Sequence, residues 1–422
     1  MGKPTVVVVE PYSSGNMLAP ALRLEGFSPC AVTAAGYSAG NASTLRLRDF
    51  DNHVVYEGFD VDPLIQKLRE LNPVAIVPGT QSGISLADKL AAVLTPNLAN
   101  VPALSSARHH KGDMHAAVAA AGLPTIRSLC SANFAAIETW ITAQGLSGRD
   151  LVIKPPESAA TNGVKFVPGR GCWRAVAEGL MGAEDIYGRP IDELLVQEYV
   201  TGTEYAVDTF SYDGIHTVND IARYHKVSTD TCMAIYESME FLPFDGLGHQ
   251  EIVTYLEGVL NALGIRFGAA HSEIMVTDRG PLLVEVNARL SGGGQPWTCQ
   301  MATDDNSIDR MLRYLLGRHD IPRAYSLEMT VIVIFFAVKS AGVVAKIREL
   351  DAIRDLASCC YLGVNVADGD YVPETTDLVH AQKLGMAVLA HEDPGQVYSD
   401  HREARRIAAT AGRPGGFTID PL

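Results

Sequence analysis

The most constraining feature of this chain is the segment HSEIMVTDRGPLLVEVNARLSGGG at residues 271–294. Two runs of strand-like composition flank TDRGP, which is rich in turn residues, so we predict a β-hairpin. Because side chains alternate between the two faces of a strand, the second strand separates polar from apolar residues. One face carries Glu285, Asn287 and Arg289, and the other carries Val284, Val286 and Ala288.

The register of this hairpin decides its chemistry. If the turn centres on Arg279, Glu273 of the first strand lies opposite Glu285, on the same face as His271. Magnesium prefers oxygen ligands and usually takes one or two carboxylates together with substrate phosphates. Glu273, Glu285 and Asn287 are therefore candidate Mg²⁺ ligands. The alternative is a solvated strand face with ordinary charged residues.

Composition excludes several classes of protein. The chain has 422 residues, enough for two or three domains, and a net charge of −15, which argues against nucleic acid as the main partner. No cationic, apolar leader precedes the first strand, and the longest apolar stretch, residues 329–338, is too short to span a bilayer. Seven scattered cysteines without a CxxC spacing suggest a reduced, cytoplasmic protein.

The pattern along the chain predicts a mixture of α/β and α+β structure. Residues 1–100 alternate strand and helix, which predicts a parallel sheet. A helix is expected within 105–124, capped by Ser105 or Ser106, and a β-rich segment ending in a helix follows residue 325. We place domain boundaries near residues 100 and 325. Neither a GxxxxGK[ST] loop nor a strand-linked GxGxxG is present, which argues against P-loop and Rossmann dinucleotide sites.

Two lysines stand where phosphate could bind. Lys154 ends a predicted strand and precedes a loop of small residues, which lets backbone N–H groups approach a phosphate. A surface lysine before a turn is an equally good interpretation of Lys154 alone. Lys111 lies early in the predicted helix, after His109 and His110, and without context is best explained as solvated. The two histidines point about 100° apart on a helix, which is poor geometry for one metal site.

The segment VQEYVTGTE at residues 196–204 predicts strand, turn and strand. Glu204 could hold ribose hydroxyls, and the backbone of 198–200 could pair with an adenine edge. Another hairpin with an exposed acid is the more ordinary explanation for this segment taken alone.

Taken together and in this order, these elements resemble a known family, although no single one of them does. A helix lysine, a strand lysine with a small-residue loop, QEYVxGxE and E…ExNxR follow one another as in the ATP-grasp superfamily, over roughly residues 100–325. Within it, PGTQSGISLADKLA, HSEIMVT and VEVNARLSGG look most like the L-amino acid ligases that make dipeptides. The resemblance implies an ATP-grasp fold with an N-terminal βα domain (1–100), an ATP-grasp domain (101–325) and a β-rich C-terminal domain (326–422).

The resemblance also implies roles for individual residues. Lys111 and Lys154 match lysines that hold ATP phosphates, and Arg289 matches an arginine that steadies the acyl phosphate and tetrahedral intermediate. The other nucleotide and substrate positions are Ser158, Ala160 and Thr161 in the phosphate loop, Gln197, Glu198 and Val200 at the adenine edge, Glu204 at the ribose, and Ser291, Gly292 and Gly293 near the substrate carboxylate. Glu273, Glu285 and Asn287 match the magnesium ligands. Many family members have more glycine in the phosphate loop than this chain has at 158–161.

The implied activity is ATP-dependent ligation of two L-amino acids through an acyl phosphate, with ATP and Mg²⁺, or Mn²⁺ as a substitute, as cofactors. His271 is a candidate base for the incoming amine, although a packed histidine is the commoner reading. The 157–163 loop and 222–238 are expected lids, and the resemblance implies a homodimer. Three alternatives stay open: a ligase for other acid–amine pairs, a carboxylase-like enzyme, and a nucleotide-binding protein without catalysis.

Substrate specificity is the least determined feature. We expect residues 14–16, 80–83, 222–238 and 291–297 to surround the substrate. Trp297 and Tyr236 would limit the size of its side chains, or belong to the core.

Overall fold

The computed structural model describes residues 2–36, 41–58, 60–158, 161–228, 234–412 and 415–418. The N-terminal region forms a four-stranded parallel sheet in the order β3-β2-β1-β4. Its elements are β1 (Thr5–Val9), α1 (Leu18–Leu24), β2 (Ser28–Ala34), β3 (Asn52–Tyr56), α2 (Asp62–Arg69), β4 (Pro73–Pro78) and α3 (Ile84–Leu94). The predicted βα alternation and parallel sheet are confirmed.

Strand β1 is apolar at every position from Val6 to Val9 because both of its faces are buried. Val6 and Val8 pack with α1 and with the later helix α9 (Ser307–Leu315), whereas Val7 and Val9 pack with α2 and α3. Both faces of the parallel sheet are therefore covered, so its strands need no polar side.

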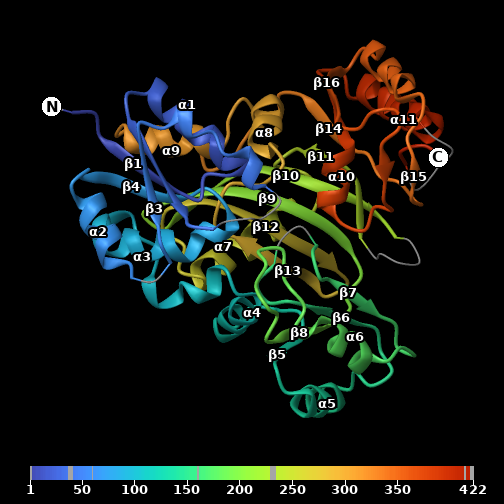
Figure 1. The fold of residues 1–422 in the computed structure, drawn as a ribbon, viewed down its shortest axis with the longest axis horizontal. Helices are drawn as coiled ribbons and strands as arrows, with labels where there is room; N and C mark the ends of the chain where they lie inside the picture. Colours follow the sequence, from blue (N-terminus) through green and yellow to red (C-terminus); the bar gives the residue numbers. More distant parts are fainter. Residues whose placement is uncertain are drawn as a thin grey trace.

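A second, smaller sheet lies in the middle of the chain. Its order is β5-β8-β6-β7 and all its pairs are antiparallel. It consists of β5 (Ser128–Ser131), β6 (Leu151–Lys154), β7 (Lys165–Val167) and β8 (Leu194–Glu198), with α5 (Phe134–Ala143) and α6 (Trp173–Leu180) packed in the same core cluster. Figure 1 shows this unit, in green and teal, at one end of the molecule, below the long central strands.

The third sheet has eight strands in the order β13-β12-β9-β10-β11-β14-β18-β16, all pairs antiparallel. Its strands are β9 (Thr203–Tyr212), β10 (Ile215–Val227), β11 (Ile235–Leu242), β12 (Gly268–Thr277), β13 (Gly280–Asn287), β14 (Thr330–Phe335), β16 (Cys359–Val364) and β18 (Gly385–His391). The accompanying elements are α7 (His249–Ala262), α8 (Gln295–Thr303), the short pair β15 (Gly342–Val343) and β17 (Tyr371–Val372), the 3₁₀ segment Ile347–Asp355, α10 (Leu378–Leu384) and α11 (Pro394–Thr410).

This sheet runs across residue 325, because β11 pairs with β14. The C-terminal strands therefore extend the sheet that also carries the hairpin, as Figure 1 shows along its upper right. The three-part division of the chain stays a prediction. No helix in the described part of the chain is long and apolar enough to cross a bilayer.

The hairpin of β12 and β13 has the predicted register. Glu273 pairs with Glu285 and His271 pairs with Asn287. The predicted place of Val284 is wrong: the register shifts between Glu273 and Ile274, so Val284 is a bulged residue that lines the central cleft while Val286 stays in the core. A bulge inserts one residue and so breaks the simple alternation.

Helix α4 (Lys111–Ala120) begins later than predicted. Residues Ser106–Arg108 form a separate 3₁₀ turn, and His110 caps α4 by accepting the N–H of Asp113 on Nδ1 at 3.1 Å. The predicted caps at Ser105 and Ser106 are therefore wrong. The consequence is that Lys111 is the first residue of the helix.

Candidate active site

A cleft of about 1680 Å³ lies between the small sheet and the eight-stranded sheet. Its walls bring together residues that are far apart in sequence. Of the predicted site residues, those that line it are Lys111, Lys154, Ser158, Thr161, Gln197, Glu198, Val200, Glu204, His271, Glu273, Glu285, Asn287, Arg289, Ser291, Gly292 and Gly293. Ala160 lies outside the described residues.

The acidic face of the hairpin forms one wall. Glu273 and Glu285 are opposite each other on neighbouring strands, and the Asn287 amide donates to Oε1 of Glu285 at 2.9 Å. Burial opposes ionisation of Glu285, but the ammonium groups of Lys111 and Lys154 outweigh it and lower the pKa of this carboxyl. The hairpin thus presents two carboxylates and an amide oxygen to the cleft. Oxygen donors of this kind suit Mg²⁺.

Two buried ammonium groups face this wall. Lys111 and Lys154 are 6% and 7% exposed. Nζ of Lys111 lies 2.9 Å from Oε2 of Glu285 and donates to the carbonyl oxygen of Ser158 at 2.7 Å. Burial, and then the charge of Lys111, lower the pKa of Lys154 to about 8. The two ammonium groups repel each other in this buried place, and a bound polyanion would offset that repulsion. The pair therefore fits a polyphosphate.

The strand β8 and the turn after it form the wall where adenine was predicted. The Gln197 amide nitrogen lies 3.0 Å from Nε2 of His115. The Glu198 carboxylate is held by Arg127, at 2.6 Å, and by Arg279, at 2.7 Å. A side-chain role for Glu198 toward a ligand therefore has little support, since its carboxylate is already paired with two guanidinium groups.

Glu204, the predicted ribose acid, pairs with Nζ of Lys226 at 2.5 Å. Burial raises the pKa of Glu204, although Lys226 counteracts it. Lys226 also lies over the ring of Tyr236, 4.2 Å from its centroid. Sequence analysis missed Lys226. The spacing could have indicated it: Lys226 is two residues after Tyr224 on the same strand, so both side chains lie on the cleft side of β10.

His271, the predicted base, lines the cleft and is paired with a buried aspartate. Its Nδ1 lies 2.6 Å from Oδ1 of Asp208, and its Nε2 lies 3.8 Å from Oε1 of Glu273. Burial disfavours the charged ring, but Asp208 overrides it and raises the pKa of His271 to about 10. The contact with Asp208 thus favours the charged ring, and the role of His271 in accepting a proton stays a prediction. Asp208, a second residue missed from sequence, also accepts from the Ser291 hydroxyl at 2.5 Å.

Arg289 lies just beyond the end of β13, where the chain turns away from the sheet. Its backbone N–H donates to the Asn287 carbonyl at 2.7 Å, and its guanidinium Nη1 donates to the Leu290 carbonyl at 2.6 Å. The following turn, with Gly292 and Gly293, leads into α8, and the Gly294 N–H donates to the Ser14 hydroxyl at 3.1 Å. The predicted substrate turn thus contacts the N-terminal region.

The two predicted lids differ in form. In the 157–163 loop, the Ser158 hydroxyl donates to the Asn162 carbonyl at 2.9 Å, so these two residues of the loop are in contact. Thr161, in the same loop, adopts a positive φ of 60°. Most of 222–238 belongs to strands β10 and β11 rather than to a loop, and residues 229–233 lie outside the described part.

Of the two aromatic residues predicted to limit substrate size, one lines the cleft and the other does not. Tyr236 is buried and lines the cleft, edge-on to Tyr224 with ring centroids 4.8 Å apart. Trp297 is 37% exposed and packs against Tyr361 outside the cleft lining, with centroids 5.7 Å apart. Only Tyr236 is therefore positioned to limit the size of a ligand.

Comparison with known proteins agrees with this geometry. The ATP-grasp domain model matches residues 147–297. Dapdiamide A synthase of Enterobacter agglomerans is 25% identical over 421 residues, covering 96% of each chain.

Solved structures resemble the whole fold. An L-amino acid ligase from Bacillus licheniformis has a TM-score of 0.72 at 18% identity, covering 96% of this chain and 98% of that one. The ADP complex of an N5-carboxyaminoimidazole ribonucleotide synthetase has a TM-score of 0.67 at 15% identity, covering 96% of this chain and 97% of that one. Together these findings show an ATP-grasp domain over residues 147–297 and, for the chain as a whole, an ATP-grasp fold close to that of an L-amino acid ligase.

Proposed function

We propose that this protein is an ATP-dependent carboxylate–amine ligase that joins two L-amino acids into a dipeptide and releases ADP and phosphate. The observation that carries the proposal is the pairing across one cleft of two buried lysines with the Glu273, Glu285 and Asn287 face, with Arg289 at its edge. The full-length similarity to dapdiamide A synthase and the fold shared with an L-amino acid ligase support the same reaction class.

ATP and Mg²⁺ fit the groups that are present. The Lys111 ammonium is paired with Glu285, so phosphate oxygens would replace Glu285 as its partner. That exchange would release a carboxylate oxygen for a metal. Glu273, Glu285 and Asn287 would hold Mg²⁺, or Mn²⁺ in its place, and the metal would neutralise phosphate charge and orient the γ-phosphate toward the substrate carboxylate.

The chemistry begins with a poor electrophile, because a carboxylate would have to lose oxide. Transfer of the γ-phosphoryl group to a carboxylate oxygen converts that oxygen into phosphate, which is a good leaving group. Lys111 and Lys154 would balance the charge that remains on the phosphates. The amine of the second amino acid then forms a bond to the carbonyl carbon, and Arg289 would stabilise the tetrahedral oxyanion through its N–H donors.

The incoming ammonium must lose a proton before it attacks. Because Asp208 raises the pKa of His271, we propose a carboxylate or the substrate phosphate as the acceptor of this proton. Water must also be excluded, since it would hydrolyse the acyl phosphate. We propose the 157–163 loop and residues 222–238 as the covering segments. Shortening either is expected to raise ATP hydrolysis relative to ligation, and unchanged coupling would contradict this role.

A second candidate is a ligase that joins another carboxylic acid and amine. The relative similar to this chain over 96% of its length is named a dapdiamide synthase, so acids or amines beyond the common amino acids belong in the test. We further propose that the enzyme is a homodimer, which its mass in solution tests.

The decisive experiment supplies ATP, Mg²⁺ and all pairs of the common amino acids, and measures ADP, phosphate and product masses. Dipeptide masses formed in step with ADP are expected. Phosphate release without a dipeptide would favour the second candidate. ATP binding without release for any pair would contradict the dipeptide activity, and the same result with other carboxylic acids and amines would contradict the second candidate. Lys154→Met should abolish turnover, whereas Lys89→Met, an exposed lysine on α3, serves as the matched control.

A further inference from the structure

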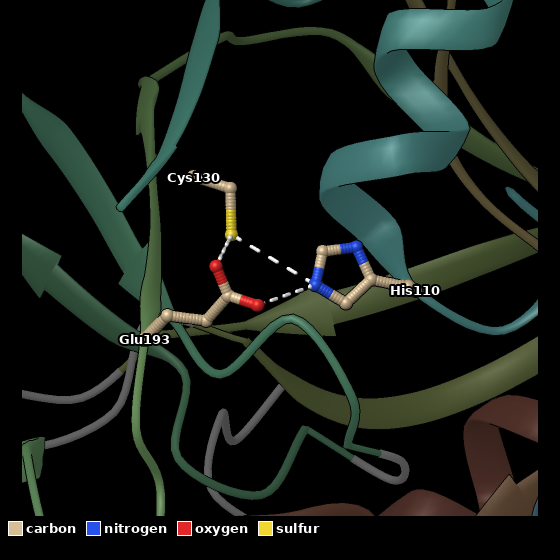
Figure 2. Close-up of side chains that lie close together, drawn as sticks. All are labelled: His110, Cys130 and Glu193. Atoms are coloured by element: carbon tan, nitrogen blue, oxygen red, sulfur yellow. Dashed lines mark hydrogen bonds and ion pairs between the residues drawn. The ribbon is translucent and has the colours of Figure 1, made fainter. Parts of the chain in front are cut away.

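Three side chains with metal-binding atoms meet away from the cleft lining. His110 comes from the cap of α4, Cys130 from β5, and Glu193 from the residue just before β8. Figure 2 shows the Glu193 carboxylate between the Cys130 thiol and the His110 ring, with all three pointing toward one another. Among the residues that the structure describes, it is the only group of three such ligands.

The distances in this cluster suit a single ion. Nε2 of His110 lies 3.0 Å from Oε1 of Glu193, and the Cys130 sulfur lies 3.3 Å from Oε2 of Glu193 and 4.0 Å from Nε2 of His110. A tetrahedral zinc ion with ordinary bond lengths separates its nitrogen, oxygen and sulfur ligands by roughly 3.3–3.6 Å. His110 and Cys130 contact different oxygens of Glu193, and one ligand atom from each of the three residues lies within 4.8 Å of the others, so the side chains would close in by roughly 1 Å or less to share one ion.

We propose that His110, Cys130 and Glu193 form a binding site for a zinc-class divalent cation, with water as the fourth ligand. Thiolate and imidazole select zinc and similar transition metals over magnesium, which prefers oxygen ligands. The site is therefore chemically distinct from the Glu273, Glu285 and Asn287 set. All three side chains are only partly buried, with Glu193 38% exposed, so an ion and its water have access.

Gly112 is a second feature that suits this site. A Cβ at this position would lie 2.7 Å from Cβ of Cys130 and 3.0 Å from Cε1 of His110. Glycine is unfavourable inside a helix, and Gly112 is the second residue of α4. The absent side chain is what allows the thiol and the imidazole to approach each other.

Asp113 lies beside Nδ1 of His110, the ring nitrogen that does not face Cys130 and Glu193. Nδ1 of His110 accepts the Asp113 N–H at 3.1 Å, which leaves the proton of a neutral ring on Nε2. Binding through Nε2 would move that proton to Nδ1, which would end the cap that Nδ1 makes to the Asp113 N–H, and Oδ2 of Asp113, now 3.6 Å away, would have to move closer to accept the proton. A carboxylate that receives this N–H orients the ring and strengthens it as a ligand. The Cys130 thiol loses its proton to solvent when the metal–sulfur bond forms.

The test adds one equivalent of Zn²⁺ to the reduced, metal-free full-length protein in excess Mg²⁺, and measures retained zinc against a competing chelator. One zinc per chain is expected. Cys130→Ala and His110→Ala should each weaken binding at least tenfold. The control is Cys172→Ala, which removes an exposed cysteine elsewhere. Cobalt in place of zinc should give a thiolate-to-cobalt charge-transfer band in the wild type and the control but not in Cys130→Ala.

A third readout covers variants that fold poorly. In the wild-type protein, zinc should protect Cys130 from alkylation, located by peptide mass, while Cys172 stays reactive. Gly112→Ala should weaken zinc binding as well, since it pushes the thiol and imidazole apart. Failure to retain zinc, retention that Cys130→Ala leaves unchanged, or alkylation of Cys130 at the same rate with zinc would each overturn the proposal. The three side chains would then form only a hydrogen-bonded cluster.

Discussion

We expect the charge of Lys154 to lower the free energy of unfolding when no nucleotide is bound. Replacing Lys154 with methionine measures this cost. Lys154 is 7% exposed, and burial together with the charge of Lys111 lowers its pKa to about 8 from an ordinary value near 10.5. The unfolded chain therefore holds this proton more firmly than the folded one. Each pKa unit corresponds to about 1.4 kcal/mol, so the charge of Lys154 costs the folded state about 3 kcal/mol at pH 7.

Lys154→Met retains most of the apolar stem and removes that charge, so it should raise the free energy of unfolding at pH 7 by up to about 3 kcal/mol. The sign of the pH dependence is fixed by the two pKa values. Between pH 8 and 10.5 the unfolded state binds more protons, so the wild type gains stability as pH rises. The advantage of the variant should therefore fall to about 1 kcal/mol at pH 9.5.

The assay is urea unfolding of both proteins at pH 7 and pH 9.5, without nucleotide. Lys89→Met, at an exposed position, is the control and should change stability by less than about 0.5 kcal/mol. Mg-ATP at 100 times its Kd should stabilise the wild type by about 2.7 kcal/mol and Lys154→Met much less. The reasoning would be refuted if Lys154→Met were less stable than the wild type at pH 7. It would also be refuted if the stability difference between the two proteins were the same at pH 7 and pH 9.5.

Three further predictions concern separate parts of the molecule. Asp305→Ala leaves the fully buried Arg310 guanidinium without the carboxylate 2.8 Å from its Nε, so urea unfolding should record a loss of about 3–5 kcal/mol; a loss below about 1 kcal/mol would contradict this. Burial raises the pKa of Glu10 to about 7, although the N–H of Ala34 counteracts it, so the contribution of Glu10 to wild-type stability should fall by about 3 kcal/mol from pH 4.5 to above pH 7. Glu10→Gln should remove that dependence, and an unchanged pH profile would count against it. Arg289→Met should leave ATP affinity within about twofold while slowing amide formation by about 10²–10³-fold, measured by product mass; a parallel loss of ATP binding would argue for a different role.

The register of the hairpin was predictable because a short turn and period-2 alternation determine which residues face each other. Glu273 lies opposite Glu285 as expected. The bulge at Val284 was not predictable, because one inserted residue leaves the composition of the strand unchanged. The cap at His110 was missed for a related reason, since a 3₁₀ turn at Ser106–Arg108 displaces the start of α4.

Contacts between distant segments were beyond sequence reasoning. Glu198 lies within a predicted nucleotide motif, yet Arg127 and Arg279 hold its carboxylate, and they come from a preceding loop and from the hairpin turn. Cys130 and Glu193 are 20 and 83 positions from His110, so no spacing motif links them. His271 was considered as a base from its place on the hairpin, and Asp208 on the neighbouring strand changes its charge.

The most direct test of the central claim follows oxygen from the substrate carboxylate. The protein is supplied with ATP, Mg²⁺ and an amino acid pair that yields product, with the acid component labelled with ¹⁸O in its carboxylate. If the carboxylate is activated as an acyl phosphate, the inorganic phosphate that is released carries one ¹⁸O atom for each amide bond formed. Product formation with unlabelled phosphate, or with the label in AMP, would contradict the account.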